Sequence, residues 1–211
     1  MDRINLRFSE LLISRLCHEL VGAAGAIGNG IEYLEEHSEQ IADTEVVSLL
    51  SNSSVQLTSR LKFYRVAYGF AGNAIDNIAE LRSLAFRFYD ADPDVSLTWQ
   101  MAPIAPDLSA GEGRLILNVI LLARQSIGLA GDINVSLDDD QIVISGVGDG
   151  VKENGEFVSI SSGEKAIDDL SAKNVHEFLT CQLAAQLGMK ISQSVGMAEK
   201  TPQILFCIQK S

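Results

Sequence analysis

The sequence predicts an α+β protein in which a long N-terminal helical hairpin precedes an α/β sandwich. Two observations carry this prediction. Apolar residues recur every seven positions in two long N-terminal segments, which is the spacing of helices that pack against one another. After about Asn77, short alternating runs are mixed with shorter helical periods, which indicates strands and helices in one layer. We therefore divide the chain into a hairpin at residues 1–72 and an α/β domain at residues 73–211.

The first helix is predicted from Leu6 to Glu36 by two rows of apolar or small residues. The rows are Ile13, Leu20, Ile27 and Leu34, and beside them Leu16, Ala23 and Gly30. Residues seven apart lie on one face of helices that wind around each other, so this face packs against another helix. Further apolar residues flank the rows and give the helix a second side to bury.

The second helix repeats the same period. Its rows are Leu50, Leu57 and Tyr64, flanked by Val47, Ser54, Leu61 and Tyr68. Asp43 or Thr44 can cap its start, and Gly69 and Gly72 end it. Because only residues 37–43 connect the two helices, they form an antiparallel hairpin.

A lone hairpin leaves one apolar stripe uncovered. The simplest way to bury the stripe is against a second copy, which gives a homodimer with a four-helix bundle made from two chains. The alternative is that the stripe packs on the C-terminal half of the same chain. The two-sided apolar character of the first helix favours both arrangements together.

Beyond Asn77, short elements of both kinds follow one another. Helical spacing predicts helices over residues 78–88, 110–130 and 174–187. Alternation predicts strands over 95–99, 133–137, 141–145, 190–195 and 203–208, with a further strand near 156–160. The acidic turn Asp138-Asp139-Asp140 separates two of these strands. This order predicts a mixed sheet with helices on one face.

Composition narrows the classes of partner. The chain carries a net charge of -12, which disfavours binding to a phosphate backbone. Its 3 cysteines are too few and too scattered for a disulfide framework. The N-terminus lacks a signal-peptide pattern, and no run approaches the roughly 20 consecutive apolar residues of a membrane span. We therefore expect a reduced, cytoplasmic protein with no nucleic-acid or membrane partner.

His18 is the candidate reactive residue. With Ile13 at the first heptad position, His18 takes the sixth, on the face opposite the packing rows. A macromolecular partner can reach an imidazole there, and the acidic residue Glu19 follows at once. Phosphoryl transfer needs mainly positioning and charge neutralisation. An exposed histidine beside an acid therefore suits a phosphoryl-accepting role.

The residues around His18 are candidates for catalysis and docking. Glu19 either orients the imidazole and stabilises its proton, or is a solvated helix residue. Arg15 lies one turn before His18; it either neutralises a phosphoryl group, pairs with a partner's carboxylate, or makes a weak exposed ion pair. The other members of this face are Leu11, Ser14, Val21, Gly22 and Gly25. Small and apolar side chains on an exposed face suit partner docking.

A helical hairpin with an exposed His-acid pair, followed by an α/β layer, resembles a sensor histidine kinase core. In kinases the second domain binds ATP through two asparagines four residues apart and an Asp-x-Gly-x-Gly turn. Here Asn118 fits the first asparagine, but Leu122 takes the second position, and an apolar side chain cannot coordinate Mg²⁺. In the turn Gly146-Val147-Gly148-Asp149-Gly150, Gly146 takes the place of the adenine-binding aspartate. The scaffold pattern remains while both ATP-binding groups are missing.

The motif around His18 is similar to one family, the ChpT-type histidine phosphotransferases of alphaproteobacteria. That motif reads Arg15-Leu16-Cys17-His18-Glu19-Leu20, followed by Gly25-Ala26-Ile27-Gly28-Asn29-Gly30-Ile31-Glu32. The end of the second helix, Arg60 to Gly69, is also similar. Family members often carry Ser-Pro after the histidine motif, whereas this chain has Gly22-Ala23-Ala24, so no proline kink is expected.

The resemblance implies a homodimer without bound nucleotide or other cofactor. His18 then takes a phosphoryl group from the receiver domain of a hybrid histidine kinase and passes it to response regulators. The Mg²⁺ ion is expected on the partner receiver domain rather than on this chain. Two alternatives stay open: an active ATP-dependent sensor histidine kinase, and a non-catalytic dimer that only binds response regulators.

Overall fold

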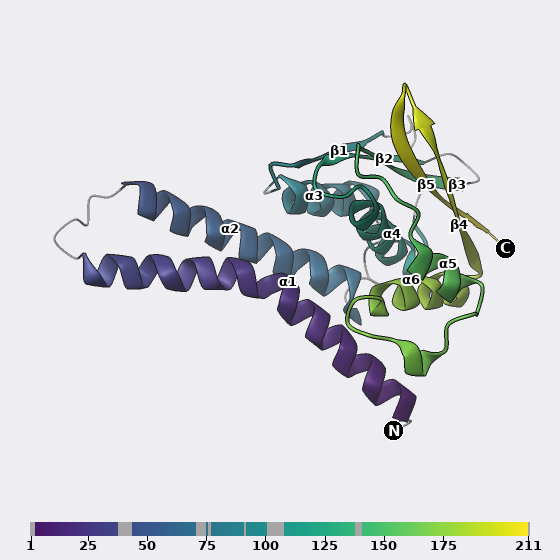
Figure 1. The fold of residues 1–211 in the computed structure, drawn as a ribbon, viewed down its shortest axis with the longest axis horizontal. Helices are drawn as coiled ribbons and strands as arrows, with labels where there is room; N and C mark the ends of the chain where they lie inside the picture. Colours follow the sequence, from purple (N-terminus) through teal and green to yellow (C-terminus); the bar gives the residue numbers. More distant parts are fainter. Residues whose placement is uncertain are drawn as a thin grey trace.

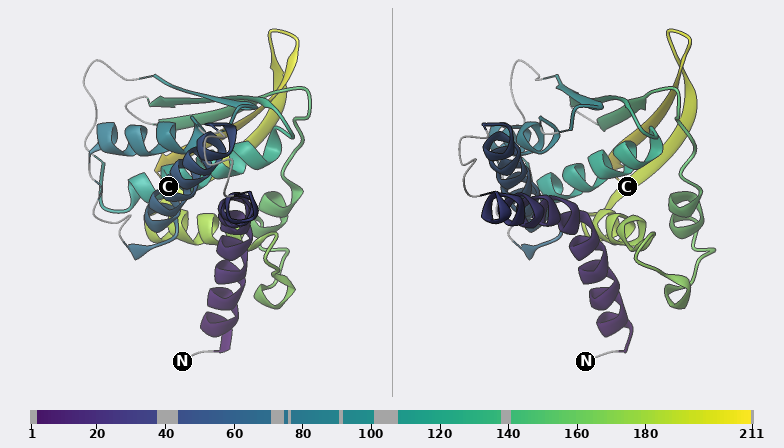
Figure 2. Two further views of the ribbon diagram at one scale, coloured as in Figure 1. Left: turned by 90° about the vertical axis from the view of Figure 1, so that its left-hand side faces the viewer. Right: turned by 60° about the vertical axis from the view of Figure 1, so that its left-hand side comes forward.

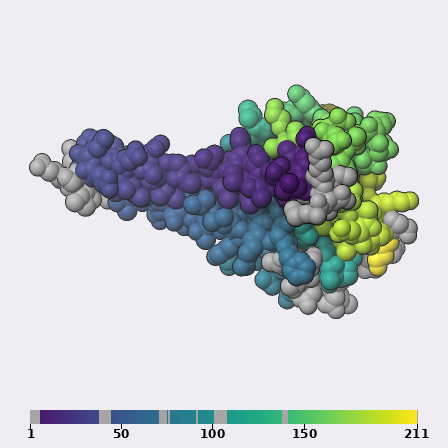
Figure 3. Space-filling view, turned by 90° about the horizontal axis from the view of Figure 1, so that it is seen from below, coloured from purple at the N-terminus to yellow at the C-terminus, as the bar shows by residue number. Residues whose placement is uncertain are grey.

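A helical hairpin projects from an α/β layer in the computed structural model (Figure 1). The structure describes residues 3–37, 44–70, 75, 77–90, 92–100, 108–137 and 141–210. The hairpin helices are α1 (Arg3–Glu36) and α2 (Thr44–Ala67). They lie side by side along the projecting arm (Figure 3), which confirms the predicted hairpin. Asp43, Gly72 and the predicted acidic turn at 138–140 lie outside the described residues, as does most of the predicted domain boundary.

α1 is one continuous helix that bends near its middle (Figures 1 and 2). Glu19 belongs to this middle part, and its main-chain carbonyl accepts a hydrogen bond of 3.0 Å from Arg60 Nη1 of α2. A side chain that competes for a helical carbonyl, or a glycine such as Gly22, is a common cause of such a bend. The helix is therefore bent although it lacks the proline.

The seam between α1 and α2 follows only part of the predicted heptad pattern. Gly30 is buried, and a Cβ built there would lie 2.7 Å from Leu50 Cδ2, so the glycine permits a close approach of the two helices. Tyr64 is buried too, as predicted for its row. In the flanking row, Val47 is 51% and Leu61 48% accessible, whereas Tyr68 is half-buried. One row of α2 therefore meets α1, and the neighbouring row faces solvent except at Tyr68.

The first arm of α1 packs on the C-terminal layer. Its apolar residues against the core are Phe8, Leu12, Leu16 and Leu20. The Phe8 and Phe178 ring centroids lie 5.7 Å apart. Because this arm turns its other side outward, Ile13 is 60% exposed in the single chain. Its predicted place in a helix–helix seam therefore stays a prediction that depends on the homodimer. Packing of the first helix on the C-terminal half, one of the two predicted arrangements, is thus present.

The C-terminal layer is a five-stranded sheet with helices on one face (Figures 1 and 2), as predicted. Its helices are α3 (Ile78–Tyr89), α4 (Glu112–Ser126), α5 (Gly155–Ser161), a short 3₁₀ turn (Ile167–Asp169) and α6 (Val175–Gln186). Its strands are β1 (Val95–Trp99), β2 (Gly131–Leu137), β3 (Gln141–Val147), β4 (Met189–Ala198) and β5 (Thr201–Lys210). The strand order is β1-β2-β3-β5-β4, in which only the β1–β2 pair is parallel.

The main core lies between the sheet and helices α3, α4 and α6, and it extends to the end of α2. Phe63 and Ala67 of α2 are fully buried in it. α4 is buried almost all round, which explains its nearly continuous apolar run. The end of α2 is therefore built into the C-terminal layer.

The predicted strand near residues 156–160 is wrong, because this segment forms α5. Asn154 caps the helix: its Oδ1 accepts a hydrogen bond of 3.0 Å from the Phe157 main-chain nitrogen. Phe157 and Ile160 are the buried residues, and their spacing of three fits a helical turn. The asparagine cap was the signal that outweighed the short apolar alternation.

By length and composition alone, the segment Leu6–Glu36 is long and apolar enough to cross a membrane, contrary to the expectation that no such stretch exists. In this structure the same helix packs on α2 and on the C-terminal core. Some of its apolar residues pack in these two contacts, and the others remain exposed on the hairpin.

Candidate functional site

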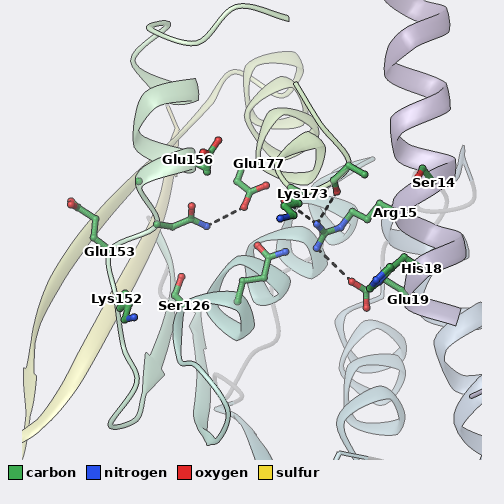
Figure 4. Close-up of a pocket in the computed structure, with 14 residues that line it drawn as sticks. Ser14, Arg15, His18, Glu19, Ser126, Lys152, Glu153, Glu156, Lys173 and Glu177 are labelled. Carbon is green, nitrogen blue, oxygen red and sulfur yellow. Dashed lines mark hydrogen bonds and ion pairs between the residues drawn. The ribbon is translucent and has the colours of Figure 1, made fainter. Parts of the chain in front are cut away.

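His18 is exposed at the edge of a cavity of about 690 Å³ between α1 and the C-terminal layer (Figure 4). From α1, Ser14, Arg15 and Glu19 line the cavity with it. From the C-terminal layer, the lining residues are Gln125, Ser126, residues 152–156, Ala172, Lys173 and Glu177. The predicted exposure of His18 is confirmed, and both parts of the chain meet beside it.

Glu19 is held by neighbours on α1 and α2. Tyr64 Oη donates a hydrogen bond of 3.3 Å to Glu19 Oε2, and Arg15 Nη2 lies 3.8 Å from Glu19 Oε1. Burial raises the pKa of Tyr64, and the negative Glu19 adds to that rise. Tyr64 therefore stays a hydrogen-bond donor at neutral pH. The described bonds of Glu19 tie it to the helix pair rather than to the His18 ring.

Arg15 is half-buried and points into the molecule. Its Nε donates to Tyr68 Oη at 3.3 Å, and its Nη1 donates to the main-chain oxygens of Ala172 at 3.4 Å and Lys173 at 3.2 Å. Burial by itself lowers the pKa of Arg15, but Tyr68, Glu177 and Glu19 together raise it. Arg15 is therefore a permanent cation whose donors already have acceptors within the chain.

The remaining predicted docking residues spread along α1. Ser14 is exposed and lines the cavity with His18, and Leu11 is half-buried one turn earlier. Val21 is 63% exposed on the other side of His18. Gly22 and Gly25 are exposed, and a Cβ at either would meet no atom within 4 Å. The structure brings Ser14 and Arg15 to the cavity and leaves the others on the open surface of α1.

The cavity wall opposite α1 was not predicted. Glu177 in the first turn of α6 is only 4% exposed, and its Oε1 accepts a hydrogen bond of 3.3 Å from Asn154 Nδ2. Burial raises the pKa of Glu177. Lys152 and Lys173 are exposed on the same wall. No sequence motif links these residues. The only related signal was the predicted start of a helix near Asn174, which indicates an ordered turn just before Glu177.

The positions that correspond to kinase ATP-binding groups are filled by packing. Asn118 is fully buried, and its Nδ2 donates to the main-chain oxygens of Ala67 and Arg114, each at 2.8 Å. Leu122 is fully buried as well. A Cβ at Gly146 would lie 2.5 Å from Ile127 Cγ2. Asn118 thus joins α4 to the end of α2, and position 146 has no room for a side chain.

The described part of the chain contains no group of three or more His, Cys, Asp or Glu side chains placed to hold a metal ion. The carboxylates of the cavity instead bind cations and amides of the chain. Glu156, for example, pairs with Lys165 and accepts a hydrogen bond of 2.7 Å from Asn174 Nδ2. These two bonds lower the pKa of Glu156.

Comparison with known proteins agrees with this architecture. The family model described as "Histidine phosphotransferase C-terminal domain" matches residues 78–199. The chain is 31% identical over 194 residues to the protein phosphotransferase ChpT of Brucella abortus (strain 2308), and the match covers 89% of this chain and 90% of that protein.

Among solved structures, a bacterial phosphotransferase superposes with a TM-score of 0.80 and 29% identity, covering 99% of this chain and 98% of the other. The histidine kinase AdeS of Acinetobacter baumannii superposes more distantly, with a TM-score of 0.46 and 10% identity over 92% of this chain and 97% of the other. The fold and the match to ChpT over most of both chains agree, and the chain belongs to the ChpT-type histidine phosphotransferases.

Proposed function

We propose that this phosphotransferase works as a phosphorelay intermediate with His18 as its phosphoryl carrier. A receiver domain, including that of a hybrid histidine kinase, donates the group, and the receiver domains of response regulators accept it. The observation that carries this proposal is the exposed imidazole of His18 at a cavity bordered by both parts of the chain. A docked receiver can contact α1 and the C-terminal layer together while its phosphorylated aspartate reaches the ring.

In the transfer step, a ring nitrogen of His18 attacks the phosphorus of the partner's aspartyl phosphate. The N–P bond forms as the P–O bond to the aspartate breaks, and the electron pair returns to the carboxylate. Reaction in the opposite direction loads the next receiver. Positioning and charge neutralisation supply most of the catalysis in such transfers, and the proposed Mg²⁺ ion of the receiver domain supplies part of that charge. This chain therefore presents the imidazole and holds Glu19 in place beside it.

We also propose that the protein relays without binding ATP itself. Two packing observations support this. The side-chain amide of Asn118 is used within the core, and position 146 cannot accept the aspartate that would bind adenine. The kinase alternative requires a different arrangement around α4, because Asn118 is bonded to the end of α2 and Gly146 of β3 lies against Ile127, just after α4.

The hairpin supports the proposed homodimer. Large apolar side chains remain exposed along both helices outside the contact with the C-terminal layer. They include Ile13, Ile31, Val47, Leu49, Val55 and Leu61. A second hairpin would cover such a stripe in a four-helix bundle. Light scattering should give the molar mass of two chains, and the mass of one chain at micromolar concentration would contradict the dimer.

The proposed setting is the cytoplasm, where receiver domains of response regulators would be the partners. The net charge of -12 fits a protein partner rather than a nucleic acid. The third possibility is a dimer that only binds receiver domains. It would use the same surface around His18 for docking, but no phosphoryl group would be transferred to His18.

Transfer from a phosphorylated receiver domain, with ATP removed, tests the proposal. Wild-type protein should take the label, His18→Ala should take none, and His37→Ala should behave as wild type. His37 is the matched control because it is a second exposed histidine, at the far end of α1. Label on His18→Ala would place the carrier elsewhere. Absence of label on wild type, with several receivers, would favour the non-catalytic dimer.

A further inference from the structure

Two arginines of α1 grip the segment that leads into α6. Arg7 Nη2 donates to the main-chain oxygens of Asp168 at 3.0 Å and Leu170 at 3.1 Å. Arg15 donates to the next pair of oxygens along the segment, those of Ala172 and Lys173. α1 is thereby fastened at two points to the stretch that forms the cavity wall facing His18.

Arg15 makes more of these connections than Arg7. Its guanidinium also donates to Tyr68 Oη beyond the end of α2 and lies against Glu19 on α1. With the Gln125 amide oriented to satisfy its neighbours, the Gln125 oxygen accepts from Arg15 and the nitrogen donates 3.1 Å to Glu177 Oε1. Only 12% of the Arg15 side chain is exposed. One planar group with five donors therefore joins α1, the end of α2, α4 and the segment before α6.

We propose that Arg15 is a positioning residue: it holds the wall formed by Ala172, Lys173 and Glu177 at a fixed place beside His18. This inference rests on the proposed function, because the fixed wall matters only if a receiver docks on both sides of the cavity. It also changes the expectation for Arg15 itself. A guanidinium whose donors serve Tyr68 and two main-chain oxygens of the chain has little capacity left for a phosphoryl group.

A positioning role and a role in the reaction at His18 make different predictions. Phosphoramidate is a small phosphodonor that needs no docked protein: its N–P bond breaks, ammonia leaves, and a new N–P bond forms on the imidazole. A receiver domain must dock before it transfers. Loss of the wall should therefore slow transfer from the receiver far more than labelling by phosphoramidate.

Arg15→Gln, Arg15→Lys and Arg7→Gln form the test set, with both donors measured on each. For Arg15→Gln we expect receiver-dependent transfer to fall at least about tenfold more than phosphoramidate labelling, mainly through a higher receiver concentration at half-maximal rate. Arg15→Lys should fall less, because an ammonium can still reach one of the acceptors. Arg7→Gln is the matched control, since it grips the same segment away from the cavity; its receiver transfer should stay within about threefold of wild type.

Hydrogen exchange supplies a readout that does not depend on any receiver. Main-chain amides of residues 172–177 should exchange faster in Arg15→Gln than in Arg7→Gln. If Arg15→Gln proves unstable, Tyr68→Phe removes a single acceptor of Arg15 and should show the same preference for receiver-dependent loss at smaller size.

Equal losses with both donors would overturn the inference, because Arg15 would then act at the reacting histidine. Unchanged receiver transfer in Arg15→Gln would overturn it as well. A wild-type protein that takes phosphoramidate label but none from any receiver would instead sink the proposed function, and the exchange measurement would still decide whether Arg15 holds the wall.

Discussion

The cavity at His18 and the core around α4 differ in how far their side chains are exposed. At the cavity, His18 is exposed and acids and lysines surround an open volume of about 690 Å³. In the core around α4, Asn118 and Leu122 are fully buried, and Gly146 of β3 leaves no space for a side chain. The first region keeps the His18 imidazole and the Lys152 and Lys173 side chains exposed to a partner, whereas the second uses the Asn118 amide within the core. A residue in a kinase-like position can therefore react with a partner only where its side chain remains free of the core.

Gly146→Asp should have the largest effect on this contrast. The new side chain would collide with Ile127 and lie close to the Ala123 carbonyl, and it would bury a charge. We expect a loss of about 4 kcal/mol or more in the free energy of unfolding, measured with urea. Gly155→Asp is the control, because a Cβ there meets no atom within 4 Å; it should cost less than about 0.5 kcal/mol. A folded Gly146→Asp protein that binds nucleotide at micromolar concentration would contradict the claim that position 146 has no room for a side chain, and it would favour the kinase alternative.

Asn118→Ala should have an intermediate effect. It removes two buried hydrogen bonds, but the Ala67 oxygen keeps a bond of 3.2 Å from Arg114 Nε. The expected loss is therefore about 1–2 kcal/mol in the free energy of unfolding. Transfer to His18 should be retained at temperatures where the variant is folded. Asn52→Ala, at an exposed site on α2, serves as the control. Loss of transfer without loss of stability would give Asn118 a direct role in the site.

Glu177→Gln should have the smallest effect, and a stabilising one. Burial raises the pKa of Glu177, so the folded protein holds this proton more tightly than the unfolded chain does. Stability from this group is present below the ordinary carboxyl pKa and is lost as pH rises through the raised value. Glutamine keeps the acceptor for Asn154 without the charge.

Thermal unfolding from pH 5 to pH 8 measures this effect. The melting temperature of Glu177→Gln should exceed that of wild type by a margin that grows with pH. Glu153→Gln, at an exposed position of the same cavity, should show no such trend. A margin that shrinks with rising pH would mean that the Glu177 carboxylate is stabilised by its surroundings, contrary to this reading of the cavity wall.

The sequence predicted those parts of the molecule that repeat a local pattern. The heptad rows gave the hairpin, and the α/β order gave the sheet with helices on one face. The exposure of His18 followed from the same heptad count. The predicted strand near 156–160 was wrong because an alternation over five residues is a weak signal beside an asparagine cap.

The cavity itself could not be predicted. Its far wall depends on the bend of α1 and on main-chain oxygens at Ala172 and Lys173, which carry no side-chain signature. Arg15 was expected to face outward because it shares a helical face with His18. Main-chain acceptors on the C-terminal layer hold its guanidinium inward instead. A long flexible side chain can reach such acceptors even when its Cα lies on an exposed face of the helix.

The two arginines of α1 also constrain the length of the helix between them. Arg7 and Arg15 are eight residues apart, which corresponds to about 12 Å along the helix and slightly more than two turns. Their acceptors lie in order on the segment from Asp168 to Lys173, those of Arg7 first and those of Arg15 after them. Substitutions between the two arginines leave this spacing intact, whereas a single inserted residue would rotate one of them by about 100°. The length of this stretch is therefore constrained more tightly than the identity of the residues within it.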